Sequence, residues 1–169
     1  MTITIWVGAL VAYLAFRLWY DGVRKPLTPD EIAHFSQAFQ DSADKGKAYV
    51  EAYLDKGIAR KKVTAEKKEA MLGRINATTD YSALSDVDLV IEAVFEDVGV
   101  KAEVTKNVEA VVPDTCIFAS NTTTLPITEL AKASKRPDQF IGIHFFSPVE
   151  KMLLVEIIKG KETGSRAVA

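Results

Sequence analysis

Three short apolar runs in the second half of the chain constrain its fold more than any other feature. They cover residues 88–95, 115–119 and 140–144. Residues 98–112 and 126–134, which separate these runs, have apolar side chains at helical spacing. Continuously apolar strands that alternate with helices are typical of parallel βαβ units. The pattern therefore predicts an α/β domain with a parallel sheet.

A fourth apolar run, residues 153–158, follows the third after a turn marked by Ser147 and a proline. The link between the two runs is too short for a parallel crossover, so the fourth strand is expected to pair antiparallel with the third. The two strands carry His144 and Glu156, each in an apolar stretch. His144 is either a packing residue at a strand end or a working base, and the pattern alone leaves both interpretations open.

Polar side chains gather where the predicted parallel strands end. Glu96 and Asp97 follow the first run, residues 120–124 follow the second, and His144 closes the third. Open parallel sheets bind ligands at the carboxyl ends of their strands. The alternative is that these residues are ordinary caps of the following helices, because Asn, Thr and Asp favour such positions. Both interpretations stay open on pattern alone.

The first twenty residues differ from the rest. Residues 3–20 are almost entirely apolar, and as a hydrophobic helix of about 18 residues they would measure about 27 Å, close to the minimum for a membrane span. Trp6 and Trp19 lie near the two ends, where interfacial aromatic residues are expected. Arg24 and Lys25 follow the apolar part, which predicts a membrane anchor with the C-terminal side in the cytoplasm. A buried or interfacial helix is the alternative. If the N-terminal segment is an artefact, the chain is expected to be cytoplasmic.

The next residues are predicted to link this segment to the α/β domain. Thr28, Pro29 and Glu31 have the pattern of a helix start, followed by a short helix through about residue 39. Residues 48–58 have helical spacing, and Thr64 is placed to cap a further helix. The residues of that helix expected to face inward are Met71, Leu72 and Ile75. We therefore predict a membrane and linker region over residues 1–39 and a domain over residues 40–169.

Composition excludes several classes of function. A net charge of −2 gives no electrostatic indication of nucleic-acid binding. One cysteine, Cys116, allows neither an internal disulfide nor a multi-cysteine zinc site, and no metal site is predicted. The apolar neighbours of Cys116 favour a core residue over a nucleophile. A hydrophobic content of 48% in 169 residues suits one domain with a real core.

Three long motifs resemble one enzyme family. They are DLVIEAVFE at residues 88–96, FASNTTTLPIT at residues 118–128 and IHFFSPVEKM at residues 143–152. In this order and spacing they resemble the 3-hydroxyacyl-CoA dehydrogenases of fatty-acid β-oxidation, and most of all the dehydrogenase part of bacterial multifunctional β-oxidation proteins. The resemblance covers about residues 40–169. It implies a Rossmann-like domain, NAD as cofactor, and oxidation of an L-3-hydroxyacyl-CoA substrate to a 3-ketoacyl-CoA.

The resemblance also implies roles for single residues. His144 matches the base that removes the hydroxyl proton, and Glu156 matches the carboxylate that orients the imidazole. A base and an orienting carboxylate suit this chemistry because an unperturbed imidazole titrates near neutrality and a carboxylate fixes its tautomer. The other matched positions are Asn121 (substrate and cofactor), Thr123 (where the family has a serine), Ser147 (where many relatives have asparagine), and Glu96 and Lys101 (near the nicotinamide ribose).

The sequence departs from the family pattern at its N-terminal side. The family begins with a strand and a G-x-G-x-x-G turn that binds the pyrophosphate of the cofactor. None of the nine glycines here forms a G-x-G. We therefore expect a partial Rossmann-like sheet without its first βαβ unit, and weak NAD binding. Residues 163–169 read as the opening of a helix, and the family's C-terminal helical domain is not expected within this chain.

Two functional hypotheses follow. The first is an NAD-dependent 3-hydroxyacyl-CoA dehydrogenase domain, impaired by the departures above, with acyl-CoA as substrate. The second is a catalytically inactive, membrane-tethered remnant that serves as an interaction module. The sequence predicts no oligomeric state.

Overall fold

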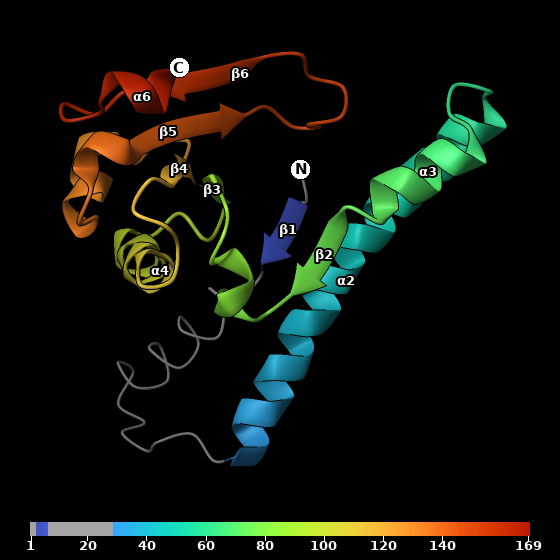
Figure 1. Cartoon of the computed structure of the whole chain (residues 1–169), viewed down its shortest axis with the longest axis horizontal. Helices are drawn as coiled ribbons and strands as arrows, with labels where there is room; N and C mark the ends of the chain where they lie inside the picture. The colour runs from blue at the N-terminus through green and yellow to red at the C-terminus, as the bar shows by residue number, and fades with distance from the viewer. Residues whose placement is uncertain (1–2, 7–28) are drawn as a thin grey trace. The chain divides into compact units, whose positions relative to one another are not determined.

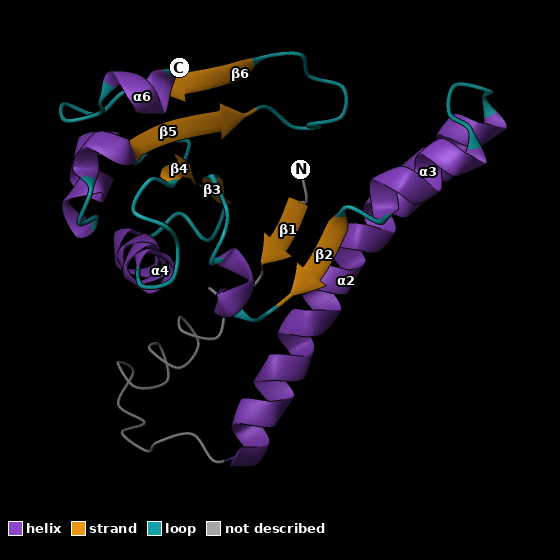
Figure 2. Cartoon of the chain, in the orientation of Figure 1, coloured by secondary structure: helices purple, strands orange, loops and turns teal. Residues whose placement is uncertain are grey.

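The computed structural model describes residues 3–6 and 29–169, which form two compact units over residues 1–83 and 84–169 (Figures 1 and 2). In the first unit, the long helix α2 spans Pro29–Ala59 and the short helix α3 spans Ala65–Leu72. Strand β1, Ile3–Trp6, pairs in parallel with strand β2, Ile75–Thr78. A 3-10 turn, Tyr81–Leu84, leads into the second unit.

Side chains of α2 hold strand β2 against it. Lys47 donates a 2.8 Å hydrogen bond from Nζ to the carbonyl oxygen of Ile75, and Gln40 donates a 3.1 Å bond from Nε2 to that of Ala77. Leu54 and Ile75 are both buried. The first unit therefore combines a small apolar core with polar contacts from helix to strand.

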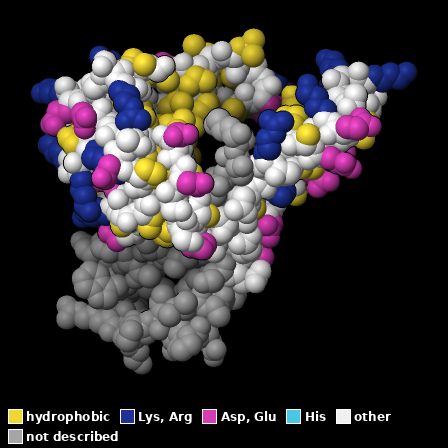
Figure 3. Space-filling model, viewed as in Figure 1, with side chains coloured by type: hydrophobic (Ala, Val, Ile, Leu, Met, Phe, Trp, Pro, Cys, Tyr) yellow, Lys and Arg dark blue, Asp and Glu magenta, His cyan; other side chains and the backbone are white. Residues whose placement is uncertain are grey.

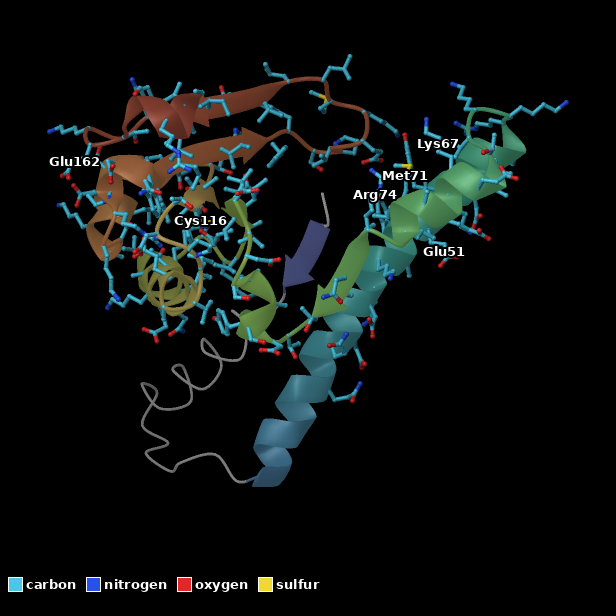
Figure 4. The ribbon with its side chains drawn as sticks, in the orientation of Figure 1. Glu51, Lys67, Met71, Arg74, Cys116 and Glu162 are labelled. Carbon is cyan, nitrogen blue, oxygen red and sulfur yellow. The ribbon has the colours of Figure 1, made fainter. Side chains whose placement is uncertain are left out.

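Several predictions for this region need correction. The helices expected before residue 39 and over residues 48–58 form one helix, α2. Thr64 caps α3 as predicted, since its Oγ1 accepts a bond from the Lys67 N–H. Ile75 was wrongly assigned to that helix. It lies on β2. Helix α3 ends at Leu72 with Gly73 as its C-cap, whereas apolar residues at helical spacing continue as far as Ile75. Met71, on α3 in Figure 4, is exposed rather than inward-facing.

Most of the hydrophobic helix predicted over residues 3–20 lies outside the described part of the chain, and it stays a prediction. Ile3–Trp6 form strand β1 instead of helix. Residues 7–20 lie outside the described part of the chain. Within the described part, no helix has the length and apolar character that a membrane crossing requires.

The second unit contains the predicted α/β sheet, with strand order β3-β4-β5-β6. Strands β3 (Leu89–Glu92), β4 (Ile117–Asn121) and β5 (Phe140–Phe145) are parallel, and β6 (Val155–Ile158) is antiparallel to β5. Both orientations confirm the prediction. The helical elements are α4 (Val98–Glu109), α5 (Ile127–Leu130), two 3-10 turns (Ala131–Ala133 and Pro137–Gln139) and α6 (Ser165–Val168).

The core of this unit lies between one face of the sheet and its crossover helices. Phe118 on β4 and Phe140 on β5 stack with ring centroids 5.2 Å apart, and both are buried. Cys116, labelled in Figure 4, is 2% exposed, which confirms it as a core residue. Helix α5 comes so close to β5 that a Cβ atom on Gly142 would lie 2.5 Å from the side chain of Ile127. Only glycine fits at that point without a rearrangement.

The strand register decides which side chains share this covered face. Glu92 is paired with Ser120, and Ser120 with Gly142. Side chains two residues apart on a strand point to the same face, so His144 lies on the face of Gly142. Its partner on β6, Glu156, lies there too. Leu153, Val155 and Ile157 are exposed hydrophobic residues of this unit. Figure 3 shows hydrophobic side chains on the surface of the molecule.

Candidate functional site

The carboxyl ends of β3, β4 and β5 bring the predicted site residues to one edge of the sheet. Three parallel strands in register end on the same side, so the loops that follow them are neighbours (Figure 1). Direct contacts show this closeness. Glu96, after β3, bonds the loop after β4, and Asn121, at the end of β4, accepts a 3.5 Å bond from the N–H of Phe145 on β5. Asp97 has the ordinary role instead, as the N-cap of α4.

His144 and Glu156 form a hydrogen-bonded pair across the antiparallel strands. The distance from His144 Nδ1 to Glu156 Oε2 is 2.8 Å, and the two residues are direct register partners. A carboxylate can only accept, so Nδ1 carries the proton and Nε2 keeps its lone pair in the neutral ring. Within the described part of the chain, Nε2 makes no hydrogen bond. The imidazole side chain is 19% exposed and packs beside the Phe146 ring, with centroids 4.7 Å apart.

Glu96 gathers the donors of the β4–α5 loop. Its Oε1 accepts from the Thr122 hydroxyl at 2.6 Å, the Thr123 N–H at 2.8 Å and the Thr124 N–H at 2.9 Å. Burial alone raises the pKa of this carboxyl. The bonds from Thr122, Thr124 and Thr123, together with the Lys101 charge, outweigh that effect and hold the pKa at about 2. Glu96 is therefore a carboxylate at any physiological pH.

Lys101 is buried on α4 and held entirely by protein groups. Its side chain is 1% exposed, and Nζ donates to Glu92 Oε1 at 2.9 Å, to the Asn121 carbonyl at 2.9 Å and to the Val94 carbonyl at 3.4 Å. Glu96 Oε2 lies 3.8 Å away. An ammonium group has three donors, and these contacts use all three.

Two residues around Lys101, Glu92 and Ser120, were not predicted as site residues from the sequence. Glu92 and Ser120 are 4% and 0% exposed, and the Ser120 hydroxyl donates to Glu92 Oε2 at 2.7 Å. The available signal was a carboxylate inside an apolar strand motif, since a buried charge requires a partner. We call Glu92, Lys101 and Ser120 the buried cluster.

The remaining predicted residues lie at the same edge but make fewer contacts. Thr123 is exposed, and its backbone N–H rather than its hydroxyl bonds Glu96. Ser147 is exposed in the loop after β5. The structure thus links Asn121 to Lys101 and Thr123 to Glu96 by hydrogen bonds, brings Lys101 within 3.8 Å of Glu96, and joins His144 to Glu156. The roles assigned to these residues stay predictions.

Comparisons with known proteins agree with this arrangement. Residues 33–169 match the family 3-hydroxyacyl-CoA dehydrogenase, NAD binding domain. The fatty acid oxidation complex subunit alpha of Shewanella amazonensis is 41% identical over 134 residues, which are 77% of this chain and 19% of that protein. The chain therefore spans about a fifth of the length of the curated relatives it matches.

Two solved structures share the fold and much of the sequence. (S)-3-hydroxybutyryl-CoA dehydrogenase from Ralstonia eutropha is 41% identical with a TM-score of 0.71, over 74% of this chain and 44% of that one. 3-Hydroxybutyryl-CoA dehydrogenase from Escherichia coli is 34% identical with a TM-score of 0.73, over 76% of this chain and 27% of that one. These findings confirm the resemblance and the expected cofactor. The chain belongs to the NAD-binding domain family of the 3-hydroxyacyl-CoA dehydrogenases.

Proposed function

We propose that this chain provides the catalytic sheet edge of an NAD-dependent 3-hydroxyacyl-CoA dehydrogenase of fatty-acid oxidation. Its reaction converts an L-3-hydroxyacyl-CoA to the 3-ketoacyl-CoA. The observation that carries the proposal is the His144–Glu156 pair, whose 2.8 Å bond engages Nδ1 and leaves Nε2 as a base. The solved relatives named as 3-hydroxybutyryl-CoA dehydrogenases support the substrate class.

The pair suits removal of a hydroxyl proton. Nε2 of His144 accepts the proton from the 3-hydroxyl, and the Glu156 carboxylate stabilises the imidazolium that forms. Bound NAD supplies the acceptor for the hydride that leaves C3. Asn121 lies on the adjacent strand end and is half-buried, and Thr123 and Ser147 present exposed hydroxyl groups on the neighbouring loops. We assign these three side chains to the substrate.

The residues present fit the nicotinamide end of NAD. Oε1 of Glu96 is taken by the β4–α5 loop, whereas Oε2 has only the distant Lys101 contact and remains available to a ribose hydroxyl. Lys101 is buried, so its part near the cofactor is to hold Glu96 and Asn121 in place. For the pyrophosphate the sequence offers no G-x-G turn, and we expect weak affinity for the free cofactor.

The test is NADH oxidation by the chain in the presence of a 3-ketoacyl-CoA. We expect a measurable rate that is lost in His144→Gln. The chain has one other histidine, so His34→Gln is the matched control and should keep the rate. A rate for the unmodified chain no greater than that of His144→Gln would reject the proposal and favour the inactive-remnant hypothesis.

A further inference from the structure

The buried cluster of Glu92, Lys101 and Ser120 is costly to form, which calls for an explanation. Moving a carboxylate and an ammonium out of water costs several kcal/mol per ion, and an apolar pair of similar size is often as stable or more stable. Both charged side chains here are 1% exposed. Stability alone therefore does not explain why this position holds an ion pair.

The contacts of Lys101 show what the ion pair does. The ammonium bridges the two loops of the site edge, since it binds the Val94 carbonyl after β3 and the Asn121 carbonyl at the end of β4. Glu92 Oε1 also accepts a 2.6 Å bond from the Val94 N–H. An apolar side chain at position 101 could fill the space but could not hold either carbonyl.

The second step leads from Asn121 to the proposed catalytic pair. Lys101 fixes the peptide group of Asn121, whose side-chain oxygen accepts from the Phe145 N–H. Phe145 directly follows His144 on β5. Glu92 contacts none of the proposed reacting groups, yet two intervening residues connect it to the strand end that carries the base.

We propose that Glu92 is a positioning residue that acts through Lys101 to fix the Asn121 peptide and the Thr122–Thr124 loop. Glu92 holds the ammonium, the ammonium holds the Asn121 carbonyl, and Ser120 fixes the second carboxylate oxygen. The effect on turnover rests on the proposed dehydrogenase function. The effect on the conformation of the Asn121 peptide and its loop does not depend on that function, and it is measured separately.

Amide nitrogen NMR shifts test the geometric part. The ¹⁵N shift of Thr122 reports the hydrogen bond on the preceding Asn121 carbonyl. Glu92→Gln and Lys101→Met should move the Thr122, Thr123 and Phe145 signals. Lys106→Met is the matched control, because Lys106 is an exposed lysine on the same helix, and it should leave them unchanged. An unmoved Thr122 signal in a folded Lys101→Met variant would overturn the proposal.

The double variant Glu92→Leu/Lys101→Met separates positioning from mere stability. Removing both charges should recover part of the stability lost in Lys101→Met alone, and it provides a folded protein if that single variant unfolds. We expect the altered Thr122 and Phe145 shifts to remain. We also expect kcat to stay about tenfold to a hundredfold low with little change in KM, as small misplacements of reacting groups produce.

Recovery of both the shifts and kcat in the double variant would show that the cluster only stabilises the fold, and would reject the proposal. If the unmodified chain has no turnover, the dehydrogenase assignment fails. The NMR shifts then decide the positioning proposal by themselves.

Discussion

The second unit contains two acid–base pairs of nearly equal length in opposite surroundings. His144 and Glu156 lie 2.8 Å apart with side chains 19% and 52% exposed. Lys101 and Glu92 lie 2.9 Å apart with both side chains 1% exposed. The exposed pair keeps one ring nitrogen without a hydrogen-bond partner in the described part of the chain, whereas the buried pair uses all its donors on protein acceptors.

This difference is the one expected between a group that reacts and a group that supports, the roles proposed above for His144 and Lys101. A base has to keep a lone pair open to its substrate, so it cannot be fully bonded. A supporting charge has to be fully bonded, because a buried charge without partners is very unfavourable. The distance between the partners does not distinguish the two pairs. Their burial does, and so does the presence of a nitrogen that has no hydrogen-bond partner.

The largest expected effect is the loss of the exposed base. His144→Gln should lower kcat by about 10²–10⁴-fold, which is the usual contribution of a general base. Its free energy of unfolding should change by about 1 kcal/mol or less, since the partner carboxylate is exposed. Steady-state kinetics and urea unfolding measure the two effects. Equal losses of activity and stability would remove the distinction between the pairs.

Breaking the buried pair should lower the free energy of unfolding by much more than the loss of His144 does. Lys101→Met leaves Glu92 charged and without its partner, which typically costs about 3–5 kcal/mol of unfolding free energy. Urea unfolding of the variant beside Lys106→Met measures this loss. A cost no larger than that of the exposed control would mean that the pair is not formed in solution.

A smaller effect is expected when the exposed pair loses its charge but keeps its shape. Glu156→Gln removes the carboxylate that stabilises the imidazolium, and hydrogen bonds to charged groups are worth about 1.5–3 kcal/mol. We therefore expect kcat to fall by about one to two powers of ten. Glu150→Gln, an exposed carboxylate in the same hairpin loop, serves as control and should have no effect. Unchanged kcat in Glu156→Gln would remove Glu156 from the mechanism.

The smallest effect concerns Glu96, which lies between the two extremes with 37% of its side chain exposed. Its pKa is lowered from 4.5 to about 2, so the folded state prefers the ionised form. The resulting stabilisation is complete above about pH 4.5 and is lost as the pH falls toward about 2. Unfolding measured from pH 6 to pH 2 should show a weaker acid dependence in Glu96→Gln. Identical profiles would contradict this assignment.

Much of the second unit could be predicted from sequence because its signals are local. The strand runs, the antiparallel turn and the Asp97 cap each depend on a few adjacent residues. His144 and Glu156 required the family resemblance, since a histidine in an apolar run has a packing explanation of equal merit. Their mutual contact then followed from the register of two neighbouring strands.

The misses have physical reasons. Met71, Leu72 and Ile75 keep helical spacing across Gly73, and spacing alone does not show that the chain changes from helix to strand there. Glu92 was treated only as part of an apolar strand motif. Its partner, Lys101, lies on the following helix, and the strand pattern gives no sign of that contact. The two residues are only nine positions apart, but their burial and their contact depend on how α4 packs on the sheet, which the local sequence does not show.

The antiparallel pairing of β5 and β6 has an evolutionary consequence. His144 and Glu156 meet because they are register partners, and the loop between their strands helps to fix that register. A slip by one residue would send the carboxylate to the opposite face, so the strands are strictly constrained. Residues 146–154 carry further requirements, because Ser147 is assigned to the substrate and the Phe146 ring packs beside His144. A change in the length of this hairpin loop is therefore tolerated only where it preserves the register that pairs His144 with Glu156.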